Sequence, residues 1–257
     1  MHGPSNPAAL ARAAALFDRD PASLAPRLRD GVIDLLGGDF APTFTQRVFD
    51  SATTAWLYDL GRDRLTGLIG MPDFRSEVRA LDERLALAKG DIVLDVACGQ
   101  GNFTVELARR VGPEGLVVGL DIAASMLARA TNRVRRERLD NVILVRGDAL
   151  ALPFRDAAFT KLNCSGGLHQ MPDLDRALAE MARVGRPGAR FTGSSFARDG
   201  SEEAGVRGWL WRRWSLHFVP IVALGRAVEA AGFDQVEAQM AGPAMGYAWG
   251  RRPLTAP

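Results

Sequence analysis

Apolar and polar residues change their spacing repeatedly after residue 90, and each change marks a new element. Short runs rich in Val, Ile and Leu predict buried strands. These runs cover residues 91–97, 115–120, 141–146, 157–163, 189–196, 235–240 and 245–250. Between them, apolar residues that recur three and four positions apart predict amphipathic helices. The helical stretches cover residues 103–111, 123–136, 173–184 and 220–231.

The order of these elements predicts the architecture of the main domain. Strands that alternate with helices form βαβ units, whose strands run parallel within one sheet. The last two predicted strands have no helix between them, so they should close the sheet as an antiparallel hairpin. We therefore expect an α/β fold with a Rossmann-like, seven-stranded and mainly parallel sheet over residues 87–257.

Two segments depart from this alternation. Residues 1–86 contain no comparable strand pattern and predict helices broken at proline and glycine, which we interpret as an N-terminal helical cap or lid. Residues 197–220 form an insertion before the last helix and carry Trp209, Trp211 and Trp214. We expect these two segments to shape the acceptor pocket above the ends of the strands.

A glycine turn follows the first strand of the main domain, in the segment VLDVACGQGNFT at residues 93–104. Gly99 and Gly101 let the backbone approach a ligand closely with dihedrals that a side chain would forbid. The next helix would direct its free N–H groups at an anionic part of the ligand. Thr104 stands where a dinucleotide fold has its third glycine, which disfavours tight packing against a pyrophosphate.

Two further carboxylates end the second and third strands of the main domain. Asp121 can accept hydrogen bonds from both ribose hydroxyls, and Asp148 can accept one from the exocyclic amine of adenine. Taken singly, Asp121 is also typical of a helix N-cap and Asp148 of a turn. A nucleotide-sugar site, a nicotinamide site or a sheet without a ligand remains the alternative to an adenosine site.

Four motifs in order give the chain a family resemblance: VLDVACGQG, GLDIAASML, GDALALPF and CSGGLHQMPDLDRALAEMARVGRPGARF. Over residues 87–196 the sequence resembles the class I S-adenosylmethionine-dependent methyltransferases, and among them the ubiquinone/menaquinone-biosynthesis group. The resemblance implies S-adenosyl-L-methionine as the cofactor and S-adenosyl-L-homocysteine as its product.

The resemblance also implies the contacts of the cofactor. The matching positions cradle its methionine part at Asp95, Ala97, Gly99 and Gly101, where Ala97 replaces a common glycine. The position that matches Asp121 holds the ribose. The positions that contact the adenine match Ile122, Met126, Asp148 and Ala149, and those that lie under the sulfonium match Asn163 and Ser165. Tyr58, near Trp56, matches a helix with a lid residue, although both aromatics could equally pack the cap onto the sheet.

Methyl transfer from a sulfonium mainly requires alignment of the acceptor and exclusion of water. We therefore expect no metal ion, and the chain has no His, Cys or carboxylate cluster with ligand spacing. His169 is the best-placed base for an acceptor that must lose a proton, or else it closes its loop by hydrogen bonding. His217 and His2 are weaker candidates.

Composition narrows the partners and the compartment. The net charge is +2, and the basic residues are interleaved with acidic ones, so no stripe for nucleic acid forms. We expect a small, mostly apolar acceptor of quinone, aromatic or polyketide type, no membrane span, a cytoplasmic location and a possible homodimer. A methyltransferase-like protein that uses its bound cofactor structurally, as a cyclase or binding module, is the alternative.

Overall fold

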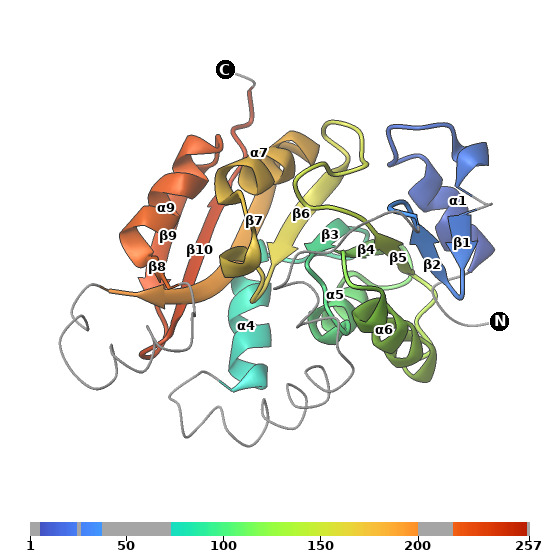
Figure 1. Cartoon of the computed structure of the whole chain (residues 1–257), viewed down its shortest axis with the longest axis horizontal. Helices are drawn as coiled ribbons and strands as arrows, with labels where there is room; N and C mark the ends of the chain where they lie inside the picture. Colours follow the sequence, from blue (N-terminus) through green and yellow to red (C-terminus); the bar gives the residue numbers. More distant parts are fainter. Residues whose placement is uncertain (1–5, 25–26, 38–72, 200–217, 256–257) are drawn as a thin grey trace.

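The computed structural model describes residues 6–24, 27–37, 73–199 and 218–255. Within these residues one ten-stranded sheet runs in the order β1-β2-β5-β4-β3-β6-β7-β10-β9, with β8 paired to β7 (Figure 1). Its strands are β1 Leu28–Arg29, β2 Val32–Asp34, β3 Ile92–Val96, β4 Leu116–Asp121, β5 Val142–Arg146, β6 Phe159–Cys164, β7 Gly185–Arg198, β8 Val219–Pro220, β9 Asp234–Met240 and β10 Met245–Arg251.

The centre of the sheet is parallel and its last pair is antiparallel, as the alternation of elements predicts. Strands β2, β5, β4, β3, β6 and β7 pair in parallel. Strand β10 pairs antiparallel with β7 and with β9, which forms the predicted terminal hairpin. All seven predicted strands are present, so the predicted Rossmann-like α/β fold is confirmed.

Helices cover both faces of this sheet, with α1, α7 and α9 above it and α4, α5 and α6 below it in Figure 1. Their bounds are α1 Pro7–Ala14, α4 Phe74–Leu85, α5 Asn102–Val111, α6 Ala124–Arg136, α7 Leu174–Val184 and α9 Ile221–Ala230. Leu94 and Val96 of β3 belong to the core under α1, α7 and α9, whereas Val93 belongs to the other core. Asp95 therefore shares the face of Val93, on the side of α5.

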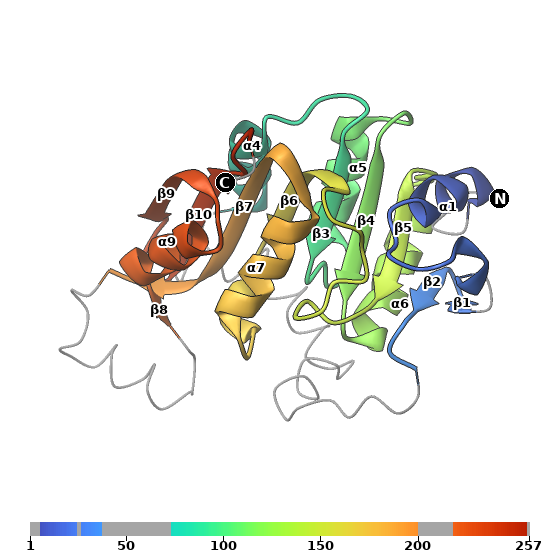
Figure 2. The same ribbon diagram turned by 90° about the horizontal axis from the view of Figure 1, so that it is seen from above.

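The N-terminal segment is not entirely helical, which corrects our expectation for residues 1–86. Strand β2 lies beside β5 and pairs with it in parallel, so β1 and β2 extend the sheet (Figure 2). Ile33 of β2 is fully buried and belongs to the core under α1. Strands of two and three residues leave too short a pattern to identify, and pairing with the open side of β5 stabilises them.

The insertion is shorter than predicted at both ends, because β7 continues to Arg198 and pairs there with β8. The predicted aromatic residues Trp56, Tyr58, Trp209, Trp211 and Trp214 lie outside the described residues, as do His2 and His217. The N-terminal lid and the acceptor pocket therefore stay predictions. Within the described ranges, no helix combines the length and apolar character that a bilayer crossing requires.

Candidate functional site

The candidate site lies at the carboxyl ends of β3, β4, β5 and β6, starting with the glycine turn after β3. Gly99 and Gly101 have φ angles of +54° and +78°, in the left-handed region that glycine adopts without strain. A Cβ on Gly101 would lie 3.1 Å from the Cβ of Ala130 on α6, so glycine permits this close packing. A Cβ on Gly99 would meet no atom within 4 Å, so the turn is open on that side.

Ala97 begins the turn and is itself left-handed, with φ +54°, although it carries a side chain. Its Cβ would lie 2.6 Å from a Cβ on Gly167, which explains why Gly167 follows β6 without a side chain. The two residues pack against each other across the site. A glycine at this position would relieve the strain that Ala97 retains.

Asp121, the last residue of β4, uses both carboxylate oxygens to tie the site together. Its Oδ2 accepts a hydrogen bond from the Gly99 amide at 2.8 Å, and its Oδ1 accepts one from the Ala123 amide at 2.9 Å. Ala123 precedes α6, so Asp121 joins the glycine turn to the start of the next helix. A carboxylate has about four acceptor sites, so a residue of this type can bind ribose hydroxyls as well as backbone amides.

Asp95 is buried behind the glycine turn and holds a chain of side-chain hydrogen bonds. Thr104 donates to its Oδ2 at 2.6 Å, and the Asn163 amide donates to its Oδ1 at 2.7 Å. Ser165 in turn donates to the Asn163 Oδ1 at 2.8 Å. Burial raises the pKa of Asp95 to about 6, the two hydrogen bonds on the carboxylate lower it, and the nearby negative charge of Asp121 raises it.

A pocket at the ends of β4 and β5 brings together the predicted adenosine residues. Asp121, Ile122, Asp148 and Ala149 line it together with Ala97. Asp148 Oδ1 accepts from the Leu150 amide at 2.9 Å, so Asp148 forms the turn expected from its sequence alone while also lining the pocket. No basic side chain is among the lining residues of this pocket.

Sequence reasoning missed the opposite wall of this pocket. Gly167, Gln170, Met171 and Pro172 line it after β6, within the motif GGLHQMPD. The available signal was the motif itself, since it follows β6 within a few residues and so lies near the carboxyl end of that strand. Met126, predicted beside the adenine, is half-buried on α6 and is not among the lining residues. Tyr58 lies outside the described residues.

A second residue that the sequence did not single out is Gln100, between the two glycines of the turn. Its side chain is buried, and neither its Nε2 nor its Oε1 has a hydrogen-bond partner. Buried amide groups without partners are rare in folded proteins and call for an explanation. Together with the open side of Gly99, this unused capacity is consistent with a ligand at the glycine turn.

His169 lies on the short 3-10 helix Leu168–Gln170, packed against the end of β7. Its Nδ1 accepts a hydrogen bond from the Phe196 amide at 3.3 Å, and the two rings lie 4.4 Å apart. An Nδ1 that accepts carries no proton, so the neutral ring carries its proton on Nε2. In this tautomer Nε2 is a donor, and the ring has no free lone pair for a base.

The two cysteines lie near the site but have the character of apolar side chains. Burial raises the pKa of the Cys98 and Cys164 thiols, and the carboxylates of Asp95 and Asp121 raise them further. A thiol with a raised pKa remains protonated and is a poor nucleophile. The described part of the chain also holds no group of three His, Cys, Asp or Glu side chains that could bind a metal ion.

Comparison with known proteins gives the family. The sequence profile described as the ubiE/COQ5 methyltransferase family matches residues 43–237. The demethylmenaquinone methyltransferase of Geobacillus stearothermophilus is 36% identical over 142 residues, which are 55% of this chain and 58% of that protein. The alignment with such curated relatives thus spans little more than half of their length.

Solved structures with little sequence identity share the fold. The phosphoethanolamine N-methyltransferase 2 of Haemonchus contortus aligns with a TM-score of 0.68 and 14% identity, over 82% of this chain and 59% of that one. The (4+2)-cyclase SpnF aligns with a TM-score of 0.63 and 21% identity, over 84% and 98%. At these identities the likeness concerns the fold alone. The profile match over most of the chain decides the assignment: the chain belongs to the ubiE/COQ5 methyltransferase family, as the four sequence motifs predicted.

Proposed function

We propose that this protein binds S-adenosylmethionine at the carboxyl ends of β3, β4 and β5 and transfers its methyl group to a small, mostly apolar acceptor. The observation that carries the proposal is that Asp121 and Asp148 line one pocket beside the open glycine turn, and that none of the described residues lining this pocket is basic. S-adenosylmethionine carries a sulfonium and an ammonium group, which carboxylates attract. A dinucleotide carries a pyrophosphate, which the same carboxylates would repel.

The roles of the residues follow from these positions. Asp121 would hold the ribose through its carboxylate oxygens, which line the pocket at the end of β4. Ile122, Ala149 and the side chain of Asp148 would enclose the adenine in the pocket that they line. Asp95, Ala97, Gly99 and Gly101 would surround the methionine part, while Asn163 and Ser165 would lie under the sulfonium. Met126 and Tyr58 complete the set that the family resemblance implies.

The bound cofactor supplies an activated methyl group on a good leaving group. The chain itself has to align the acceptor with that methyl group and to exclude water from it. The buried chain from Thr104 through Asp95 and Asn163 to Ser165 can fix the floor of the site for this purpose. We expect no metal ion to take part, so a chelator should leave the turnover rate unchanged.

We propose that His169 orients the acceptor rather than acting as the catalytic base. Its Nδ1 is engaged by the Phe196 amide, so its Nε2–H can donate to an oxygen of the acceptor. To act as a base, the ring would have to move its proton to Nδ1 and lose the bond to Phe196. His169 would thus be a positioning residue at the ends of β6 and β7.

For the acceptor we propose a quinone-type molecule in its reduced form, because the curated relatives are demethylmenaquinone methyltransferases. Incubation with methyl-labelled S-adenosylmethionine and a demethylated naphthoquinol should give an acceptor that has gained one labelled methyl group, detected by mass spectrometry. Phosphoethanolamine, a polar acceptor, should gain none. Asp121→Ala should abolish the product, whereas Asp175→Ala, which removes an exposed charge on α7, should not.

Cofactor binding without transfer to any quinol, phenol or polyketide acceptor would contradict the proposed methyl transfer. The cyclase or binding-module alternative would then account for the intact glycine turn. No observation favours that alternative over methyl transfer, since SpnF shares only the fold with this chain.

A further inference from the structure

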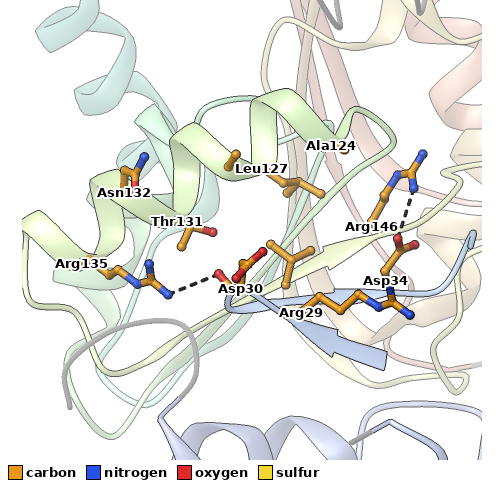
Figure 3. Close-up of a pocket in the computed structure, with 11 residues that line it drawn as sticks. Arg29, Asp30, Asp34, Ala124, Leu127, Thr131, Asn132, Arg135 and Arg146 are labelled. Atoms are coloured by element: carbon orange, nitrogen blue, oxygen red, sulfur yellow. Dashed lines mark hydrogen bonds and ion pairs between the residues drawn. The ribbon is translucent and has the colours of Figure 1, made fainter. Parts of the chain in front are cut away.

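A second cavity, of about 280 Å³, lies between the β1–β2 hairpin and α6 (Figure 3). It shares no lining residue with the candidate adenosine pocket. The residues of the glycine turn do not line it, and β5 reaches it only through Arg146, the last residue of that strand. This cavity, which we call the hairpin cavity, therefore needs an explanation of its own.

The middle of the hairpin cavity is apolar and its two ends are polar. Its apolar lining comes from Val32 of β2 and from Ala124, Leu127 and Ala128 of α6. Figure 3 shows Thr131 and Arg135 at one end and Arg29 at the other. An elongated ligand with an apolar middle and a polar group at each end would match these walls.

The charges at the Arg29 end leave one guanidinium available. Arg146 donates to the Asp34 carboxylate at 3.2 Å, so the charges of Arg146 and Asp34 neutralise each other. Arg146 also donates to the Ile122 carbonyl at 3.2 Å. Arg29 is exposed and makes no hydrogen bond or ion pair within the described residues. A guanidinium binds a carboxylate or phosphate through two parallel hydrogen bonds.

The other end holds a buried hydroxyl without a partner. Thr131 is 3% exposed, and its Oγ1 has no hydrogen-bond partner among the residues that the structure describes. Figure 3 shows this hydroxyl on the side of α6 that faces the hairpin. Arg135, one turn further along α6, already donates to the Asp30 carbonyl at 3.3 Å. Arg135 and Asp30 bring one charge of each sign to this end, so it suits a neutral hydroxyl or carbonyl rather than a further charge.

We propose that the hairpin cavity binds a small organic anion with an apolar, ring-sized middle, an acidic group at Arg29 and a neutral hydrogen-bonding group at Thr131. The unpartnered Thr131 hydroxyl and the unpartnered Arg29 guanidinium are the two contacts that such a ligand would complete. The ligand differs in charge and position from S-adenosylmethionine, so both can bind at once. The hairpin that sequence reasoning missed thereby forms one wall of a ligand site.

Calorimetric titration of the full-length protein with three probes tests this proposal. The probes are 3-(4-hydroxyphenyl)propionate, which has both polar groups, 3-phenylpropionate, which lacks the hydroxyl, and tyramine, which reverses the charge. We expect saturable binding of both acids, with a higher affinity for hydroxyphenylpropionate than for phenylpropionate, and no binding of tyramine. No saturable binding of either acid, or tyramine binding as tightly as they do, would overturn the proposal.

Two variants and a matched control assign the contacts. Arg29→Gln should weaken both acids by about ten- to hundredfold, as expected when a charged hydrogen bond is lost. Arg136→Gln, an exposed arginine on α6 outside the cavity, should leave their affinity unchanged. Thr131→Val should weaken hydroxyphenylpropionate several-fold and leave phenylpropionate unchanged. Equal effects on the two acids, or none from Arg29→Gln, would overturn the assignment.

Thermal unfolding provides a second readout for Thr131. Because Thr131→Val removes an unsatisfied buried hydroxyl at nearly constant volume, we expect its Tm to rise while its affinity for hydroxyphenylpropionate falls. A lower Tm would show that the hydroxyl is satisfied within the protein, which would also overturn the proposal. The affinity for S-adenosylmethionine, measured in parallel, keeps this test separate from that of the proposed function.

Discussion

Asp95, Asp121 and Asp148 occupy similar places at strand ends, yet their partners give them different capacities. Asp121 binds two backbone amides, Asp148 binds one, and Asp95 binds two side chains in a buried network. Sequence alone predicts their convergence, because parallel strands end at the same side of the sheet. It does not predict their partners, such as Thr104 and Asn163, which reach Asp95 from other elements.

The raised pKa of Asp95 predicts a pH dependence of stability. Because its pKa is about 6 in the folded protein and 3.8 ordinarily, the folded state binds more protons between these values. The contribution of Asp95 to the free energy of unfolding should therefore be largest below about pH 4 and should be lost as the pH rises to about 6. The expected fall is on the order of 2–3 kcal/mol.

Asp95→Asn isolates this contribution, since an amide does not titrate. Urea unfolding of the cofactor-free protein at several pH values should show a shallower decline between pH 4 and 6 in the variant than in the wild type. Parallel declines in the two proteins would contradict an Asp95 with a raised pKa.

Ala97 predicts an unusual gain on substitution by glycine. Its left-handed φ of +54° costs an alanine free energy that glycine avoids, so Ala97→Gly should stabilise the protein by up to about 1 kcal/mol. Ala179→Gly in the middle of α7 should instead destabilise it by about 1 kcal/mol. The two free energies of unfolding, measured in urea, should differ in sign. If Ala97→Gly lowered the free energy of unfolding as much as Ala179→Gly does, the backbone strain at Ala97 would be contradicted.

For His169 the orienting role predicts small kinetic effects. Gln can still accept from the Phe196 amide through its side-chain oxygen and can donate to an acceptor, so His169→Gln should retain turnover within about tenfold of the wild type. His169→Ala loses both bonds and should raise KM for the acceptor more strongly. A loss of about 10²–10⁴ in kcat for His169→Gln, together with a lost acidic limb, would show that His169 is the base.

At the scale of elements, the N-terminal hairpin is the clearest difference from expectation. Pattern and length predict the seven strands of the main domain to within two residues at every end except the start of β7, which lies four residues earlier than predicted. The pattern is clearest in β3, β4 and β5, which pack runs of apolar residues against both helical layers. Strands β1 and β2 have no such run. Their pairing with β5 is a tertiary effect that local propensity does not contain.

Ile33 tests whether the hairpin is part of the core. Its side chain is fully buried under α1, so Ile33→Ala should lower the free energy of unfolding by about 2–4 kcal/mol. Val222→Ala on the outside of α9, where the valine is 62% exposed, should change it by less than about 0.5 kcal/mol. Equal and small effects in urea unfolding would mean that the hairpin contributes little to the folded state.

At the scale of the whole molecule, the two proposed sites lie at different places along the sheet. The motifs that carry the family resemblance converge at the carboxyl ends of the central strands, whereas the hairpin cavity lies beside β2, at the outer side of the sheet. The sequence predicted the first because its motifs end strands. It could not predict the second, since that cavity depends on two short strands meeting α6.

The central claim is that S-adenosylmethionine binds at Asp121, and calorimetric titration tests it most directly. Wild-type protein should bind S-adenosylmethionine with one site, and Asp121→Ala should lose about 2–4 kcal/mol of binding free energy, because two charge-assisted hydrogen bonds disappear. Asp175→Ala, which removes an exposed charge on α7, should bind as the wild type does. No binding to the wild type, or unchanged affinity in a folded Asp121→Ala protein, would contradict the account.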